Sequence, residues 1–426
     1  NPEEFINAVK LMGPTFGGIN LEDIKAPECF IIEQALKEVM DIPVFHDDQH
    51  GTAVICAAGL INALHLSGKK IQDVKIVLNG AGAAGIACIE LLKSMGAKHN
   101  NCIVCDTKGV IYQGRTEGMN QWKSAHAIST ELRSLEDAMV GADVFLGVSV
   151  KGAVTPAMVE SMAPDPVIFA MANPDPEITP EEAQAVRPDA IVATGRSDYP
   201  NQVNNVLGFP YLFRGALDIH ARAINDEMKI ACARALADLA REEVPDEVAL
   251  AYGTKLSFGR DYIIPTPFDP RLIHRIPTAV AQAGMDTGVA RRPIIDMEGY
   301  ENTLKSRMDP TQSILRSLNA RARAAQSDVI FAEGDDIRVL RAAVLYQRSG
   351  LGKALVVGRE KDIEAKLTAE GMADAVGELT IVNAANTPHL ETYKDFLYAR
   401  LQRKGMDHHD VHRLASRDRH VFASLM

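Results

Sequence analysis

One unit of the chain, residues 74–106, constrains the fold more than any other stretch. The apolar run 74–79 predicts a buried strand, and three glycines follow it in the pattern G-x-G-x-x-G: Gly80, Gly82 and Gly85. A helix is expected next, and then a second strand, 102–106. Such glycines permit a tight turn and let a pyrophosphate approach the N–H groups of a helix N-terminus. The unit therefore predicts a dinucleotide site on a parallel α/β sheet.

The glycine pattern alone is a weak signal, and a simple tight turn between strand and helix is the alternative. Here it has the context that a dinucleotide site requires, with Asp106 placed 21 residues after the last glycine. Ala83 and Ala84 complete the loop expected to contact the cofactor. Asp106 would ordinarily bind a ribose 2′-hydroxyl and favour NAD, whereas Lys108, with Lys123 further on, would suit the 2′-phosphate of NADP. These residues leave the choice between NAD and NADP open.

Strands and helices continue to alternate downstream. Three further buried strands are predicted, at 142–148, 166–172 and 190–195, and helices at 131–140 and 156–162. This alternation predicts an α/β fold with a doubly wound, parallel, Rossmann-type sheet. Ligands of such sheets bind beyond the carboxyl ends of the strands. Four polar or small residues fall there: Asp106, Ser149, Asn173 and Gly195.

A length of 426 residues predicts two or three domains. One long helical stretch is expected at 215–240, and 253–300 is interpreted as a helix-bearing connector that ends in a linker. A second parallel α/β unit then follows, with strands near 328–332, 354–358 and 379–382. The predicted segments are 1–46, 47–205 (the dinucleotide domain), 206–300 (helical return and linker) and 301–426.

Two acidic pairs precede the dinucleotide unit. Asp47-Asp48 follows the short strand 42–45, and Glu22-Asp23 ends an extended run. Hard divalent cations such as Mg²⁺ and Mn²⁺ take oxygen ligands, so the pairs are candidates for a metal site. A lone Glu-Asp is also a common helix cap or solvated turn. His46 and His50 have the spacing of half a zinc site, but a strand before the helix favours hydrogen-bonding or packing roles for them.

Composition excludes several functions. A net charge of −11 without a dense Lys/Arg block argues against nucleic-acid binding, and no apolar run is long enough to cross a membrane. Six scattered cysteines and the lack of a signal peptide are typical of a reduced, cytoplasmic protein. The chain starts at Asn1 without a methionine and ends at Met426 inside a helical pattern, which suggests cuts through larger units.

Five motifs, taken together and in this order, resemble the malic enzymes. They are Ile19–Asp23, Phe45–Ala53, Gly80–Gly85, Phe169–Pro174 and Asn204–Pro210. The resemblance covers about the first two-thirds of the chain. Residues from about 325 onward resemble the first half of a phosphotransacetylase, a pairing that is similar to the hybrid bacterial malic enzymes. The implied architecture is part of a substrate and metal domain, the Rossmann-type domain and a partial phosphotransacetylase-like domain.

The resemblance assigns roles residue by residue. Glu22, Asp23 and Asp48 match ligands of Mg²⁺ or Mn²⁺, and Asp47 matches an aspartate that orients the catalytic lysine. Asn173 and Asn205 match asparagines that contact the substrate, and Asn173 also matches a cofactor contact. Taken alone, both asparagines would be turn residues. The glycine loop, Asp106 and Lys108 match the cofactor site, and the resemblance favours NADP over NAD.

The implied activity is oxidative decarboxylation of (S)-malate to pyruvate and CO₂ with reduction of NADP or NAD. The family's general-acid tyrosine and general-base lysine lie upstream of the Glu-Asp pair, before the first residue of this chain. An alternative is therefore a catalytically incomplete module that binds nucleotides or CoA thioesters for regulation or oligomerisation. The resemblance also implies a homo-oligomer, with acetyl-CoA as a regulatory ligand of the C-terminal region.

Overall fold

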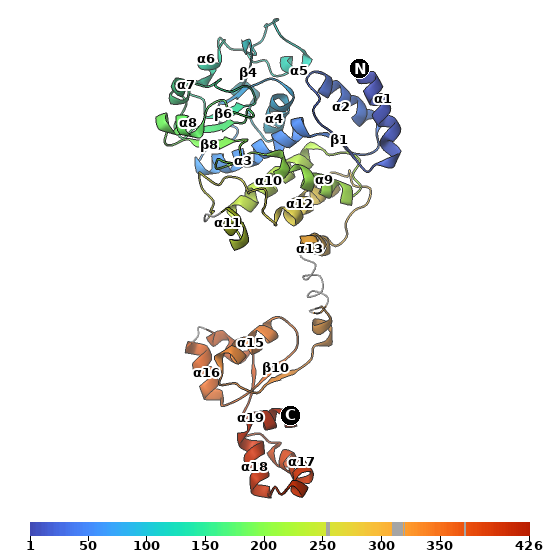
Figure 1. Ribbon diagram of the computed structural model, residues 1–426, viewed down its shortest axis with the longest axis vertical. Coiled ribbons are helices and arrows are strands. Elements are labelled where there is room, and N and C mark those ends of the chain that lie inside the picture. The colour runs from blue at the N-terminus through green and yellow to red at the C-terminus, as the bar shows by residue number, and fades with distance from the viewer. Residues whose placement is uncertain (253–255, 309–317, 319, 370–371) are drawn as a thin grey trace. The chain divides into compact units, whose positions relative to one another are not determined.

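The computed structural model describes residues 1–252, 256–308, 318, 320–369 and 372–426. The chain divides into two compact units, Asn1–Met308 and Asp309–Met426 (Figure 1). The finer division into four segments remains a prediction. Among the described residues, no helix has the length and apolar character that crossing a membrane requires.

The first unit is built on a six-stranded sheet with the order β5-β4-β3-β6-β7-β8. Its strands are β3 (Ile76–Asn79), β4 (Cys102–Asp106), β5 (Gly109–Val110), β6 (Val144–Gly147), β7 (Val167–Ala170) and β8 (Ile191–Thr194). All neighbours pair in parallel except β4 and β5. The predicted doubly wound sheet is confirmed, and the antiparallel edge strand β5 is an addition. Because β3 pairs with β4 on one side and β6 on the other, the strand order reverses there, where such sheets bind ligands.

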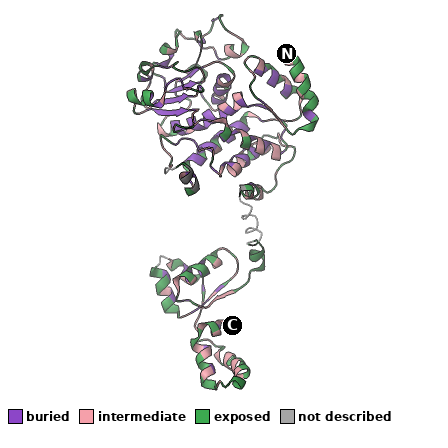
Figure 2. Ribbon diagram, viewed as in Figure 1, coloured by how far each residue is buried: buried purple, intermediate pink, exposed green. Residues whose placement is uncertain are grey.

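Alternate side chains of each strand enter separate cores on the two faces of the sheet. Ile76 and Leu78 of β3 lie in one core, and Val77 lies in the other. The first core contains α3 (Thr52–Leu66), α4 (Ala83–Ser94), α9 (Phe209–Asp218), α10 (Asp226–Arg241) and α12 (Leu272–Asp286). The second contains α6 (Leu135–Met139), α7 (Pro156–Glu160) and α8 (Pro180–Val186). Buried residues concentrate in the sheet and in α3 (Figure 2).

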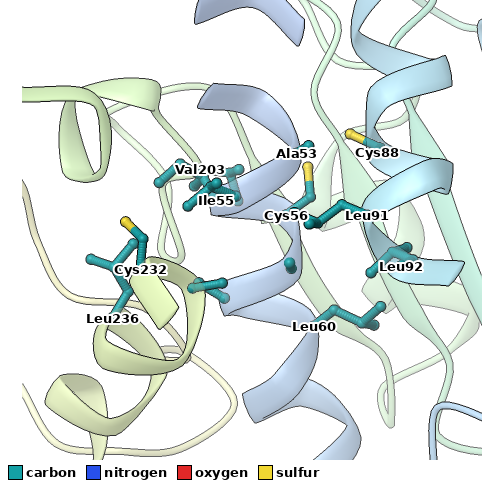
Figure 3. Close-up of a cluster of buried hydrophobic side chains, with 14 of the residues drawn as sticks. Ala53, Ile55, Cys56, Leu60, Cys88, Leu91, Leu92, Val203, Cys232 and Leu236 are labelled. Atoms are coloured by element: carbon teal, nitrogen blue, oxygen red, sulfur yellow. The ribbon is translucent and has the colours of Figure 1, made fainter. Parts of the chain in front are cut away.

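Helix α3 is the central helix of the larger core. It is rich in alanine and apolar around most of its circumference, which is typical of a fully buried helix. Figure 3 shows α3 between two other helices: Cys56 and Leu60 lie toward Leu91 and Leu92 of α4, and Ile55 lies on the side of α10. All six cysteines are buried and free. Helix α3 thus continues from the acidic stretch 47–48 and packs against α4, the helix that follows the glycine loop.

The N-terminal part of this unit contains α1 (Pro2–Met12), β1 (Ile19–Leu21), α2 (Glu28–Val39) and β2 (Val44–His46). Strands β1 and β2 form a separate parallel pair. Helices α1 and α2 pack on it around a small core with Leu21, Ile32, Leu36 and Val44.

Three sequence expectations for this unit are corrected. The helix expected at 131–140 begins only at Leu135, because Ser134 and Asp137 form a capping box there. The stretch 215–240 is two helices, α9 and α10, since the side chain of Asn225 caps a new start. Within 253–300, of which 253–255 lie outside the described residues, α12 belongs to the core and is not a connector.

The predicted parallel sheet of the second unit is confirmed, and its three strands have the order β11-β10-β9. Its strands are β9 (Val329–Phe331), β10 (Ala354–Val357) and β11 (Thr380–Val382). Its helices are α15 (Ile337–Arg348), α16 (Glu360–Ala369), α17 (Leu390–Leu401), α18 (His408–Arg417) and α19 (Arg419–Leu425). A small core of α15, α16 and the sheet holds Leu340, Val356 and Leu367.

Candidate functional site

The two acidic pairs emerge side by side from the ends of two strands. Leu21, the last residue of β1, lies opposite His46, the last residue of β2. Glu22-Asp23 and Asp47-Asp48 therefore follow adjacent parallel strands. The backbone N–H of Asp23 donates to Oδ2 of Asp48 over 2.9 Å. Residues 25 apart in the chain thus meet at one end of the pair.

Negative charge accumulates at this strand end, and among the described residues no lysine or arginine forms an ion pair with Glu22, Asp23 or Asp47. Asp47 is 8% exposed. The pKa of Asp47 is raised to about 6, mainly by burial and also by the charges of Glu22 and Asp48. The hydrogen bond from Asn205 acts in the opposite direction and lowers the pKa. Oδ1 of Asp47 is buried without a hydrogen-bond partner among the described residues. A cation at this point would relieve both the repulsion and the unpaired oxygen.

The donor types fit a hard divalent cation, but the side chains do not yet surround one point. Among the residues that the structure describes, no three His, Cys, Asp or Glu are arranged to hold a metal ion. Glu22 and Asp23 are exposed and Asp48 is partly exposed, so their carboxylates have room to rotate. The backbones of the predicted ligands Glu22, Asp23 and Asp48 thus lie near one another. Metal binding by these residues remains a prediction.

Asn205, 158 residues further along the chain, holds Asp47 by hydrogen bonds. Its Nδ2 donates to the backbone oxygen of Asp47 over 3.3 Å and to Oδ2 over 3.2 Å. Its Oδ1 accepts from the hydroxyl of Thr52 over 3.3 Å. Gly51 leaves space for the carboxylate of Asp47, since a Cβ there would lie 2.0 Å from Oδ1 of Asp47. Residues Asp47–Gly51 form a π-helical turn, a feature often found at functional sites.

The histidines of this stretch are packing and hydrogen-bonding groups, as expected. His46 lies in β2 and is fully buried. His50 contacts Oε1 of Glu33 through Nε2 over 2.8 Å, and Nδ1 faces Nζ of Lys229 at 3.3 Å. An ammonium group can only donate, so Nδ1 accepts and Nε2 donates. Burial lowers the pKa of His50 to about 4, which keeps it neutral. Sequence patterns did not single out Glu33 or Lys229.

The three glycines of the loop after β3 have different geometric roles. Gly80 has φ +116°, and a Cβ there would lie 2.4 Å from the backbone oxygen of Val148. A Cβ on Gly85 would lie 1.9 Å from the backbone oxygen of Gly80. A Cβ on Gly82 would meet no described atom within 4 Å. Gly80 and Gly85 therefore shape the loop, whereas Gly82 leaves open space in front of it.

This open space belongs to a cavity of about 660 Å³ at the carboxyl ends of β3, β4 and β6. Its size suits a dinucleotide. The lining contains the predicted residues Gly80, Gly82, Asp106 and Lys108, and also Asn79, Lys123, Arg133, Ser134 and Ser149. Ala83, Ala84 and Gly85 lie at the start of α4 and are not among the residues that line the cavity. Asn173 lies beyond β7 and is exposed.

Asp106 is enclosed by cations. Arg115 donates to both carboxylate oxygens over 2.7 and 2.9 Å, and Nζ of Lys123 donates over 2.7 Å. The backbone N–H of Lys108 donates a fourth bond over 2.9 Å. Although burial raises the pKa of Asp106, the bonds from Lys123 and Arg115 lower it below its usual value. Arg115, whose side chain is 4% exposed, is a site residue that sequence patterns did not reveal.

Comparisons with known proteins cover both units. Residues 49–252 match the family model "Malic enzyme, NAD binding domain", and residues 313–426 match "Phosphate acetyl/butaryl transferase". An NADP-dependent malic enzyme of Rhizobium meliloti is 60% identical over 427 residues, which cover 100% of this chain and 56% of that protein. An NAD-dependent malic enzyme of the same organism is 50% identical over 407 residues, 95% of this chain and 53% of that protein. The chain thus spans about half the length of these curated relatives.

A solved structure agrees with these sequence matches. The crystal structure of a malic enzyme from Pyrococcus horikoshii superposes with a TM-score of 0.66 at 40% identity. The match covers 75% of this chain and 73% of that one.

Proposed function

The chain belongs to the malic enzyme family, and from this premise we propose that the intact protein converts (S)-malate to pyruvate and CO₂ while it reduces NADP. One observation carries the proposal. A buried aspartate turn, Asp47–Gly51, runs directly into α3, and α3 packs on α4, the helix of the dinucleotide loop (Figure 3). The packed helices α3 and α4 therefore connect the acidic strand end to the loop that lines the dinucleotide cavity.

The proposed roles follow the geometry of the strand end. Glu22, Asp23 and Asp48 would hold Mg²⁺ or Mn²⁺, which fits the oxygen donors and the uncompensated charge around Asp47. Asp47 would orient a lysine ammonium, and its bond from Asn205 and its unpaired Oδ1 support this role. Asn205 and Asn173 are the proposed polar contacts of the substrate. When bound, the metal supplies Lewis-acid polarisation of the substrate oxygen, and the dinucleotide supplies the hydride acceptor.

Malate oxidation by the intact protein tests this function directly. With (S)-malate and Mn²⁺, we expect reduction of NADP that stops when a chelator removes the metal. Binding of a dinucleotide without any malate-dependent reduction would instead favour the catalytically incomplete module.

A preference for NADP is proposed from the charges around Asp106. A free carboxylate at this position would accept from the 2′-hydroxyl of NAD and repel a 2′-phosphate. Here its oxygens are occupied by Arg115 and Lys123, two cations against one anion. Arg133 and Lys108 line the same cavity, and the ammonium of Lys108 pairs with Glu117. The local charge therefore favours the additional phosphate of NADP.

Replacing Lys123 by alanine is expected to weaken NADP binding about tenfold and to leave NAD binding unchanged. The substitution removes a cation from the cavity wall, while Arg115 still donates to both oxygens of Asp106. Calorimetric titration with each dinucleotide measures the effect. Lys98→Ala is a matched control, because Lys98 is an exposed lysine paired with Asp73 and does not line the cavity. Equal losses for NAD and NADP would contradict the proposed preference.

For the second unit we propose regulation through acetyl-CoA and a contribution to a homo-oligomer. The match to the transferase model supports recognition of a CoA thioester by this region. Acetyl-CoA added to the malate assay is expected to change the rate or the assembly state. No change in either would count against a sensing role.

A further inference from the structure

Glu177 is a fully buried carboxylate that the proposed mechanism does not use. It lies on the segment that connects β7 to α8, and its exposed fraction is 0%. Among the described residues it has no ion-pair partner in Lys, Arg or His. A buried charge is costly unless hydrogen bonds compensate it. Its contacts therefore indicate what it stabilises.

Both carboxylate oxygens accept hydrogen bonds from the ends of neighbouring strands. Oε1 accepts from the backbone N–H of Ser149 over 2.7 Å and from its hydroxyl over 2.9 Å. Oε2 accepts from the backbone N–H of Ala172 over 3.0 Å. The backbone oxygen of Glu177 also accepts from the N–H of Val154 over 3.2 Å. One residue thus joins the segment after β6 to the segment after β7.

The end of β6 provides the space for this carboxylate. A Cβ on Gly147 would lie 2.4 Å from the carboxyl carbon of Glu177. Every larger residue at position 147 would displace Glu177. The glycine and the glutamate therefore act together.

The hydrogen bonds of Glu177 extend into the dinucleotide cavity. With its proton donated to Glu177, the Ser149 hydroxyl accepts from Nδ2 of Asn79 over 2.9 Å. Asn79 and Ser149 both line the cavity. Asn173, the proposed substrate and cofactor contact, directly follows Ala172, whose N–H is bound to Glu177. A single carboxylate thus holds both the cavity-lining segment after β6 and the segment after β7 that carries Asn173.

Resting on the proposed function, we infer that Glu177 is a positioning residue for the nicotinamide half of the cofactor. The glycine loop and the Asp106 cluster occupy the pyrophosphate and adenosine side of the cavity, at β3 and β4. The β6 side, with Ser149, is then the side that meets the nicotinamide riboside. Glu177 holds Ser149 and Asn79 in register there without touching the cofactor itself.

Glu177→Gln in the intact protein tests this role, because an amide of the same shape places an NH₂ group against at least one N–H donor. Two ligands separate the halves of the site. NADP spans the whole cavity, whereas adenosine 2′,5′-bisphosphate carries only the adenosine half. The variant is expected to bind NADP about tenfold more weakly than the unsubstituted protein does. Its affinity for the bisphosphate should be unchanged.

Two further variants complete the experiment. Glu182→Gln is the matched control, because Glu182 is a nearby carboxylate that caps α8 at the surface, and both affinities should be unchanged. Ser149→Ala keeps the backbone N–H but removes the hydroxyl, and should reproduce the selective loss if Glu177→Gln does not fold. Equal weakening of both ligands, or no weakening of either, would overturn the inference. These titrations need no malate turnover, so failure of the proposed function would be seen separately.

Discussion

Asp48→Asn is expected to lower malate-dependent NADP reduction by about three orders of magnitude and to leave NADP affinity unchanged. Asp48 is one of the proposed metal ligands, and its loss removes a negative donor. The asparagine oxygen can still accept from the N–H of Asp23, so the local backbone should be retained. Steady-state rates with Mn²⁺ and calorimetric binding of NADP measure the two effects separately.

Asp41→Asn is the control for this experiment. Asp41 is exposed just before β2 and pairs with Arg291 on the surface. Its replacement removes the same charge from the same region and should leave the rate unchanged. If Asp48→Asn oxidised malate at the original rate, the proposed role of Asp48 as a metal ligand would be contradicted.

Gly85→Ala is expected to weaken dinucleotide binding about a hundredfold and also to lower the thermal unfolding temperature. The new Cβ would lie 1.9 Å from the backbone oxygen of Gly80, so the loop itself must move. That movement displaces the N–H groups that would face the pyrophosphate. Calorimetric binding and a thermal melt of the same sample measure both changes.

Gly82→Ala is the matched substitution in the same loop. Its Cβ meets no described protein atom within 4 Å and points into open space. We expect an unchanged melting temperature and weaker dinucleotide binding, because only an approaching ligand would meet the methyl group. If Gly82→Ala bound NADP normally, the ligand would not approach the loop as proposed.

The sequence predicted the parts of the fold that depend on local patterns. The run from β3 through the glycines to β4 carries its periodicity and its turn residues within about thirty positions, and it was predicted nearly to the residue. The strand ends that carry Asp106, Ser149 and Asn173 followed from the same patterns. Parallel pairing then brought these ends to one edge of the sheet.

Features that depend on distant contacts were not predicted. Arg115 reaches Asp106 from an irregular loop that has no periodic signal. Lys123, which the sequence offered as a phosphate contact, reaches Asp106 from the short helix α5 (Gln121–Ser124), and this bond was not predicted. Glu177 is recognisable only through partners on the ends of two other strands. The break between α9 and α10 was also not predicted, because the apolar pattern continues on both sides of the Asn225 cap.

The most direct test of the central proposal is the product balance of the intact protein with (S)-malate, NADP and Mn²⁺. We expect one pyruvate and one CO₂ for each NADPH, with all three lost when the metal is chelated. Formation of NADPH without metal, or with oxaloacetate as the final product, would contradict the proposed function, and so would the absence of any malate-dependent NADPH.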